Sequence, residues 1–400
     1  MPTQNSDVDI VSSQVPADDR VGAVLSSRRN AEFELLRACC HSDPSSLDMA
    51  VARQDLQWDQ VFRLASDHRV LPVLYTRLHG RADVPASIQS ALRARFLGHC
   101  QRVLRFTAEF ARISRQFELA DVSVVAHKGP VVAQRLYGDA AMREFGDLDF
   151  LVRPSDLSRA RSVLLELGYA AKLTLTPRQE REYLRSGYEH VFGYGREHNL
   201  VELQWQVLPR FYAIDLKVED LFQRSRALQF ESCAVRTLCD EDLLLVLCIH
   251  AAKHQWMHLG MIRDIATLAG RDLPWAEIMR HARQLGIERM VLVSLLLARN
   301  LLGCTLPEVV SNNPGIAVSN RIALAIADDL RDERETNPES MAYFRAMAGL
   351  RERRRDKARF LVRLALTPSV GEWETLRLPD KLFPMYRGVR AFRLLKRFAA

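Results

Sequence analysis

The sequence predicts an α+β fold, in which a small mixed-sheet core is flanked by N- and C-terminal helical regions. Apolar residues recur at spacings of three and four from Ser27 to about Phe117, which is typical of helices. Short β-branched runs then alternate with helical stretches from Asp121 to Val207, and helical periodicity returns from Asp240. These changes divide the chain into a disordered leader (1–25), an N-terminal helical region (26–117), a core (118–230), a C-terminal helical region (231–375) and a basic tail (376–400).

The composition is that of a soluble globular protein, with 48% hydrophobic and 26% charged residues in 400. A net charge of +7 permits a phosphate-bearing partner. The first twenty residues have no apolar segment of a signal peptide, and Arg299 and Asn300 interrupt the longest apolar run, so we expect no membrane span. Seven cysteines without a CxxC pair predict reduced thiols and a cytoplasmic protein.

The core contains alternating strands and helices. Its glycines and prolines stand where one element ends and the next begins, as at Lys128-Gly129. Pro130 suits the first turn of a helix, because its missing amide hydrogen is not needed there. We predict strands at 122–126, 148–152, 188–194 and 200–207, the last two joined as a hairpin by 195–199, and helices at 131–137 and 154–167.

Asp147 and Asp149 are the most informative pair of residues in this core. A strand projects residues i and i+2 to the same side, so both carboxylates should point the same way. Two neighbouring negative charges at a strand end are costly unless a cation neutralises them, and Mg²⁺ or Mn²⁺ with phosphate oxygens suits carboxylate ligands. Alternatively, such a pair belongs to an Asx turn or a solvated edge.

Two further features favour the metal site. Glu202 is an isolated acid in an apolar strand, and two-metal phosphoryl transfer uses a third carboxylate. Its alternative is a solvent-facing position beside Gln204 and Gln206. The turn at Lys128-Gly129 leads into a helix, where glycine permits a close approach of phosphate and lysine adds a charge. An ordinary turn with a surface lysine is the alternative there.

These residues resemble a known family. The run from His127-Lys128-Gly129-Pro130 through Leu136-Tyr137-Gly138-Asp139 and Arg143 to Asp147-Leu-Asp149-Phe-Leu-Val152 is similar to the putative bacterial nucleotidyltransferases of the DNA polymerase β superfold. Weaker similarity extends over about 30–390, and includes Trp58 to Leu74, the strand around Glu202, and the segment His250 to Trp256 with Asp264.

The resemblance implies a role for six residues. Asp147, Asp149 and Glu202 would be the catalytic residues and metal ligands, whereas Lys128, Gly129 and Arg143 would contact the nucleotide phosphates. Lys253, in the segment His250 to Trp256, is a further candidate for a phosphate contact. A surface arginine on a loop is the alternative for Arg143. The chain departs from the pattern at Pro130, where the superfold has serine, and at Gln204, where the family has histidine.

We also predict four C-terminal helices, at 243–258, 263–269, 275–285 and 290–302. His250, His254 and His258 would share one face of the first. Lys253 would repel a cation, so we expect these histidines to pack near the cleft rather than bind zinc, with Asp264 capping or pairing with one of them. Trp256 suits a helical core better than a base-stacking role.

The tail is rich in arginine and interleaved with aromatic and aliphatic residues. This pattern is typical of a helical face exposed to solvent. The alternative is a surface that contacts RNA or an acidic partner. Phe383-Pro384 and Gly388 argue against a single long helix that lies on a membrane.

The function that follows from the resemblance is metal-dependent transfer of an NMP from an NTP, such as ATP, to a hydroxyl or phosphate acceptor. The acceptor would be a small molecule, a peptide or RNA. The alternative is a degenerate nucleotide-binding scaffold without turnover.

Overall fold

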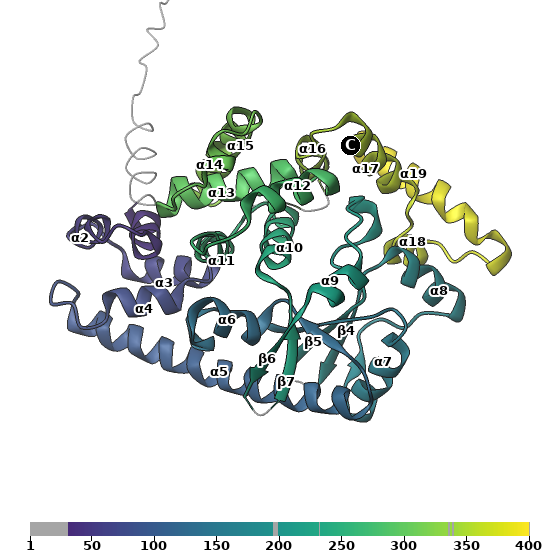
Figure 1. Cartoon of the computed structure of the whole chain (residues 1–400), viewed down its shortest axis with the longest axis horizontal. Coiled ribbons are helices and arrows are strands. Elements are labelled where there is room, and N and C mark those ends of the chain that lie inside the picture. Colours follow the sequence, from purple (N-terminus) through teal and green to yellow (C-terminus); the bar gives the residue numbers. More distant parts are fainter. Residues whose placement is uncertain (1–30, 195–198, 232, 335–336, 338–339, 400) are drawn as a thin grey trace, which may run out of the picture.

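The computed structural model describes residues 31–399, apart from 195–198, 232, 335–336 and 338–339 (Figure 1). The predicted leader therefore lies outside the described residues, as does most of the hairpin turn. The fold is α+β, as the sequence predicts, with one mixed sheet flanked by helices. Its strands are β1 (Val124–Ala126), β2 (Asp147–Val152), β3 (Ala170–Ala171), β4 (Glu189–Tyr194), β5 (Asn199–Gln204), β6 (Arg226–Phe230) and β7 (Cys233–Thr237).

The order of the strands in the sheet is β3-β4-β5-β2-β1-β7-β6. β2 runs parallel to β5, and β1 runs parallel to β7, whereas the other neighbours are antiparallel. The hairpin β6–β7 was not recognised in the sequence. Its first strand, β6, lies at the edge of the sheet and is largely exposed, so its residues show no alternation of buried and exposed positions.

One face of the sheet is covered by the long helix α5 (Ala86–Leu119) and by α7 (Leu157–Glu166). In α5 the buried residues Phe106, Phe110, Ile113 and Phe117 recur every three or four positions, which turns one stripe of the helix toward the sheet. Phe110 stacks on Phe150 of β2, with ring centroids 4.8 Å apart. This packing fixes β2 from below and turns its alternate residues, the two aspartates, to the opposite face.

The opposite face meets a helical layer built from both ends of the chain. Two of its helices, α10 (Asp240–Lys253) and α13 (Glu288–Leu302), are buried along most of their length, because their stretches 243–249 and 290–298 are almost entirely apolar. N-terminal helices complete the layer, together with helical residues 31–40. Its helices are α2 (Ser45–Val51), α3 (Trp58–Asp67), α4 (Leu71–Leu78), α6 (Gly129–Tyr137), α10 (Asp240–Lys253), α11 (Leu259–Ala269), α12 (Trp275–Leu285), α13 (Glu288–Leu302), α14 (Glu308–Ser311), α15 (Ile316–Arg331) and α16 (Met341–Gly349).

The C-terminal tail is helical, but it does not form one long helix. Pro384 lies in the 3-10 turn η3 (Asp380–Met385), and α19 (Tyr386–Ala399) begins just after it and runs through Gly388. The proline therefore stands before the helix rather than inside it. The remaining elements are α8 (Pro177–Ser186), α9 (Val218–Arg224), α17 (Arg354–Leu366), α18 (Val370–Thr375), η1 (Ala140–Met142) and η2 (Arg210–Tyr212).

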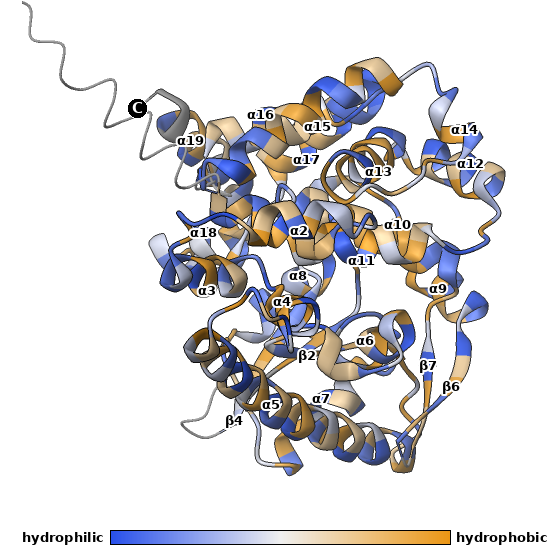
Figure 2. Ribbon diagram, turned by 90° about the vertical axis from the view of Figure 1, so that its left-hand side faces the viewer, coloured by the Kyte–Doolittle hydropathy of each residue, from blue (hydrophilic) through white to orange (hydrophobic). Residues whose placement is uncertain are grey.

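Polar and apolar residues alternate along many of the helices (Figure 2). Among the described residues, no helix has both the length and the hydrophobicity that crossing a bilayer requires. All seven cysteines are free thiols.

Candidate active site

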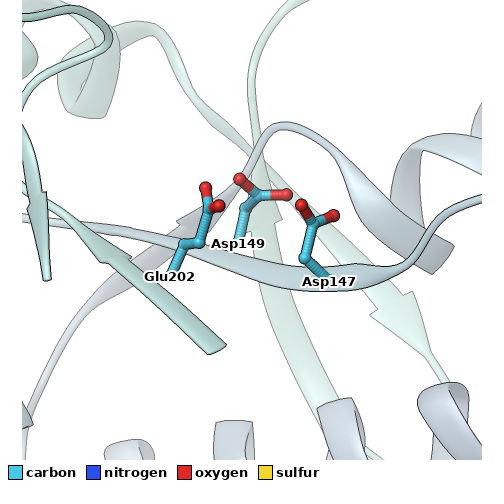
Figure 3. Close-up of side chains that lie close together, drawn as sticks. All are labelled: Asp147, Asp149 and Glu202. Atoms are coloured by element: carbon cyan, nitrogen blue, oxygen red, sulfur yellow. The ribbon is translucent and has the colours of Figure 1, made fainter. Parts of the chain in front are cut away.

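Three carboxylates meet on the face of the sheet opposite α5, and Figure 3 shows them side by side. Asp147 and Asp149 alternate on β2, and the parallel register of β2 with β5 places Glu202 directly beside Asp149. One oxygen from each residue lies within 4.8 Å of the others. The fold therefore brings Glu202 next to Asp147 and Asp149, as the sequence predicts, although more than fifty positions separate it from them.

The burial of these carboxylates makes their charges costly. Burial, and then the charge of Asp149, raises the pKa of Asp147 to about 6. Burial and the charges of Asp149 and Glu189 raise the pKa of Glu202 to about 9. For Asp149 burial acts in the same direction, but the charge of Lys128 and the hydrogen bonds to the carboxylate together hold its pKa below the usual value. The site therefore favours a cation.

The chemistry of these donors fits a hard divalent cation such as Mg²⁺ or Mn²⁺, because every one is a carboxylate oxygen. Asp149 Oδ2 is also fully buried without a hydrogen-bond partner among the described residues. A buried acceptor of this kind is costly unless another group satisfies it. Among the described residues, no other cluster of three or more histidines, cysteines or acids could hold a metal ion.

Lys128 reaches the carboxylates because β1 runs antiparallel to β2, so the end of β1 lies beside the start of β2. Lys128 Nζ lies 2.8 Å from Asp149 Oδ1. Gly129 begins α6 with a φ of +63°, a left-handed conformation that favours glycine. Pro130 stands in the first turn, as expected. The Lys128 side chain thus contacts one of the three carboxylates, that of Asp149, directly.

Arg143 lies beside the site, and its guanidinium group pairs with an acid outside the three carboxylates. Its Nε donates to Asp264 Oδ2 of α11 over 2.8 Å, and Tyr137 donates to the second oxygen over 2.7 Å. Asp264 thus pairs with Arg143 rather than capping or pairing with a histidine, which was our expectation from the sequence. The Asp264 carboxylate offsets burial and raises the pKa of Arg143.

Together with Lys128 and Arg143, two further arginines line a small cavity of about 40 Å³ next to the carboxylates. They are Arg69, which follows α3, and Arg263 on α11. Neither was predicted as a site residue, because only tertiary packing brings α3 and α11 to the sheet. Two acids, Glu144 and Asp264, line the cavity as well, so the four cations leave an excess of positive charge that suits a phosphate group.

A sequence model of a family described as an uncharacterised nucleotidyltransferase matches residues 54–303, which is more than half of the chain. The chain belongs to this nucleotidyltransferase family. The match includes the whole sheet and the α10–α13 helices. Comparisons with curated proteins and with solved structures found no match.

In this member of the family, Gln204 takes a central place that the sequence did not reveal. Gln204 is 1% exposed, whereas the sequence had left a solvent-facing position open as an alternative. Its amide nitrogen lies 2.9 Å from Asp149 Oδ1, 2.8 Å from Glu202 Oε2 and 3.3 Å from Glu189 Oε2. Glu189 faces Gln204 across the β4–β5 pair and adds a fourth acid that we had not identified. The amide donor thereby holds three carboxylates together.

Lys253 lies at the end of α10, close to the same acids. Its Nζ donates to the Tyr188 hydroxyl over 3.0 Å. Burial lowers the pKa of Lys253, although the charge of Glu189 acts against this. The ammonium group of Lys253 thus contacts a tyrosine. That Lys253 binds a nucleotide phosphate stays a prediction.

The helix predicted to end at His258 ends at Lys253 instead. Gln255 and Trp256 both adopt φ of 51°, and His258 precedes α11. The three histidines therefore do not share one helical face. His250 and His254 do pack together, with ring centroids 4.6 Å apart, and burial lowers the pKa of both.

Trp256 follows this helix end and belongs to the helical core. It is 1% exposed, and its indole nitrogen donates to Ser294 over 2.8 Å. Its core position agrees with the interpretation that the sequence favoured.

Proposed function

We propose that this protein is a metal-dependent nucleotidyltransferase that moves an NMP from an NTP to a hydroxyl or phosphate acceptor and releases pyrophosphate. The observation that carries the proposal is the register of β2 with β5, which sets Glu202 beside Asp149 in a chain of this family. Asp147, Asp149 and Glu202 supply oxygen ligands on one face, and Lys128, Arg69 and Arg143 supply positive charge next to them.

In the proposed reaction an acceptor oxygen attacks the α-phosphorus of the NTP. A new P–O bond forms, the bond to the pyrophosphate oxygen breaks, and pyrophosphate leaves. Mg²⁺ or Mn²⁺ held by Asp147, Asp149 and Glu202 would offset the negative charge of the triphosphate and of the leaving group. Glu202 would accept the proton of an acceptor hydroxyl, because a bound cation would keep its carboxylate ionised.

The cations on the other side of the site have a separate task. Lys128, Arg69 and Arg143 bind the β- and γ-phosphates, and Gly129 begins the helix whose N-terminus faces them. Lys253 is a further phosphate contact in this proposal. Because Pro130 lacks an amide hydrogen, the phosphates depend on these side chains more than on backbone donors.

The proposal is tested with NTP labelled at the α- or the γ-phosphorus, incubated with the protein and a host extract. We expect the α-label to appear in an acceptor and the γ-label to appear in pyrophosphate. Transfer of the γ-label to an acceptor would instead indicate a kinase-type reaction.

A nucleotide-binding protein without turnover is the second candidate. The ion pair between Lys128 and Asp149 favours it, because the ammonium group competes with a metal for the carboxylate. Pro130 favours it as well. Calorimetry with Mg·NTP, combined with a pyrophosphate assay, separates the two candidates: saturable binding without pyrophosphate release in the presence of extract supports the second.

The surroundings of the protein belong to this proposal too. Seven free thiols suit a reducing compartment, and we propose a cytoplasmic location. The tail is a weaker basis for RNA as the acceptor, because Arg390 and Arg393 both pair with the buried Glu372.

A further inference from the structure

The helical layer contains a cavity of about 780 Å³, separate from the acidic site. It lies between α3, the loop 255–258, α15 and α16, and Figure 2 shows α15 and α16 above α3. Residues of the three-carboxylate cluster do not line it. Cavities of roughly 300–1,000 Å³ are typical of small-molecule sites.

Aliphatic and aromatic side chains make up most of the wall. They come from segments far apart in the sequence, so the cavity is a product of the tertiary fold. An apolar molecule would gain from leaving water for such a surface. The main apolar residues are Leu64, Trp256, Ile322, Ile326, Leu330 and Leu350.

Two histidines add polar atoms to this wall. His68 is 5% exposed, and its Nδ1 is buried without a hydrogen-bond partner among the described residues. The Nδ1 of His258 is in the same state. Burial lowers the pKa of both rings to about 4, so they are neutral at pH 7 and each offers one donor and one acceptor. A ligand hydroxyl or amide would satisfy such an atom once a small rotation of the ring turns it toward the cavity.

The charged residues around the cavity cancel one another. Three arginines and three carboxylates line it. Arg63 lies 2.9 Å from Asp67 and 2.7 Å from Glu333. Arg334 lies 2.8 Å from Asp329. This pairing leaves little attraction for a charged ligand, and it distinguishes the cavity from the arginine-rich side of the active site.

We propose that this cavity is a binding site for an uncharged, largely apolar small molecule whose hydroxyl or amide group hydrogen-bonds to His68. The site borders the active site, because Asp67 and His68 line the cavity whereas the next residue, Arg69, lines the small cavity beside the carboxylates. The His68 carbonyl also accepts a hydrogen bond from Gly260 over 3.0 Å, which fixes this turn against α11. The inference does not depend on nucleotidyl transfer.

Three probes of similar shape test the proposal on the full chain by equilibrium dialysis at pH 7. They are 2-naphthol, which is uncharged and has a hydroxyl, naphthalene, which lacks it, and 2-naphthoate, which is anionic. We expect saturable binding of one 2-naphthol per chain, with naphthoate binding at least tenfold more weakly. Equal affinity for naphthoate, or no saturable binding of 2-naphthol up to its solubility limit, overturns the proposal.

Two neighbouring substitutions on α15 locate the binding. Ala325 lines the cavity and is solvent-accessible, so Ala325→Trp fills the space without disturbing the core. Leu324, which is 48% exposed and does not line the cavity, provides the matched control Leu324→Trp. We expect Ala325→Trp to weaken 2-naphthol binding at least tenfold and Leu324→Trp to leave it unchanged, with equal melting temperatures. Unchanged binding in a folded Ala325→Trp variant contradicts the assignment.

A third variant tests the proposed hydrogen bond. His68→Phe keeps an aromatic ring of similar size, and we expect it to reduce the preference for 2-naphthol over naphthalene to parity. A preference that persists in this variant contradicts the role of His68 as the polar contact.

Discussion

Lys128 Nζ lies 2.8 Å from Asp149 Oδ1, in an ion pair whose carboxylate side chain is fully buried. A buried charge that loses its partner is costly, whereas a metal can replace that partner. We therefore predict that Lys128→Met destabilises the protein without metal by about 3–5 kcal/mol. Denaturant unfolding measures this change.

The same substitution tests whether a cation takes the place of the ammonium group. Added Mg²⁺ should recover part of the stability lost in Lys128→Met, because the carboxylates again have a counter-charge. Lys357→Met, at an exposed position on α17, is the control and should change neither quantity. A Lys128→Met protein as stable as the wild type would mean that Asp149 needs no cation.

Glu202 gives a dependence of stability on pH. Its pKa in the folded state, about 9, lies above the ordinary value of 4.5, so the folded form keeps a proton that the unfolded form releases. In the wild type without metal, the contribution of Glu202 to the free energy of unfolding should be greatest at and below about pH 4.5. It should fall as the pH rises and be lost at about pH 9.

Glu202→Gln removes this dependence. We predict that the variant equals the wild type near pH 5 and exceeds it by more than about 1 kcal/mol at pH 9, since one pKa unit corresponds to ~1.4 kcal/mol. Urea unfolding at both pH values measures the difference. Glu166→Gln, at an exposed end of α7, should show no such trend. A variant less stable than the wild type at pH 9 argues that Glu202 is ordinarily ionised.

Gln204 should act as a positioning residue. Gln204→Leu removes the amide donor shared by Asp149, Glu202 and Glu189, so the three carboxylates repel one another and lose their alignment. We predict a loss of metal affinity of about 10–100-fold, as for other groups that orient metal ligands. Titration with Mn²⁺ followed by electron paramagnetic resonance measures this affinity directly. Gln206→Leu, two residues on and half-buried, is the matched control, and an equal loss in both variants would rule out a specific role for Gln204.

Arg69 should contribute to nucleotide binding more than to chemistry. Arg69→Gln removes a cation from the small cavity beside Lys128 and Arg143 but leaves the carboxylates in place. We predict a rise in KM for the NTP of about tenfold with a smaller change in kcat, measured by steady-state kinetics. Arg185→Gln on the surface of α8 should be silent. A fall in kcat at constant KM would place Arg69 in the chemical step instead.

The sequence reveals the parts of the site that depend on local pattern. Asp147 and Asp149 share a strand face because of strand geometry, and Gly129 marks a turn because only glycine takes its φ easily. Glu202 was identified as an isolated acid in an apolar strand, and the resemblance supplied its role.

The remaining parts depend on register and tertiary packing. Glu189 and Gln204 join the carboxylates only because β4 pairs with β5 in one register, which alternation alone leaves open. The end of α10 was missed because Gln255 and Trp256, which take positive φ there, carry no signal for it. Arg69, after α3, and Arg263, on α11, reach the site only through tertiary packing, and the sequence does not predict how these helices pack against the sheet.

The central claim is that Asp149 holds the cation required for nucleotidyl transfer, and the decisive measurement compares Asp149→Asn with the wild type in the assay with α-labelled NTP and host extract. Asp328→Asn, at an exposed position on α15, is the control. We predict that Asp149→Asn loses label transfer by at least about a hundredfold while still unfolding in a single cooperative transition, at a lower temperature because Lys128 loses its partner. Label transfer by Asp149→Asn at the wild-type rate would contradict the account.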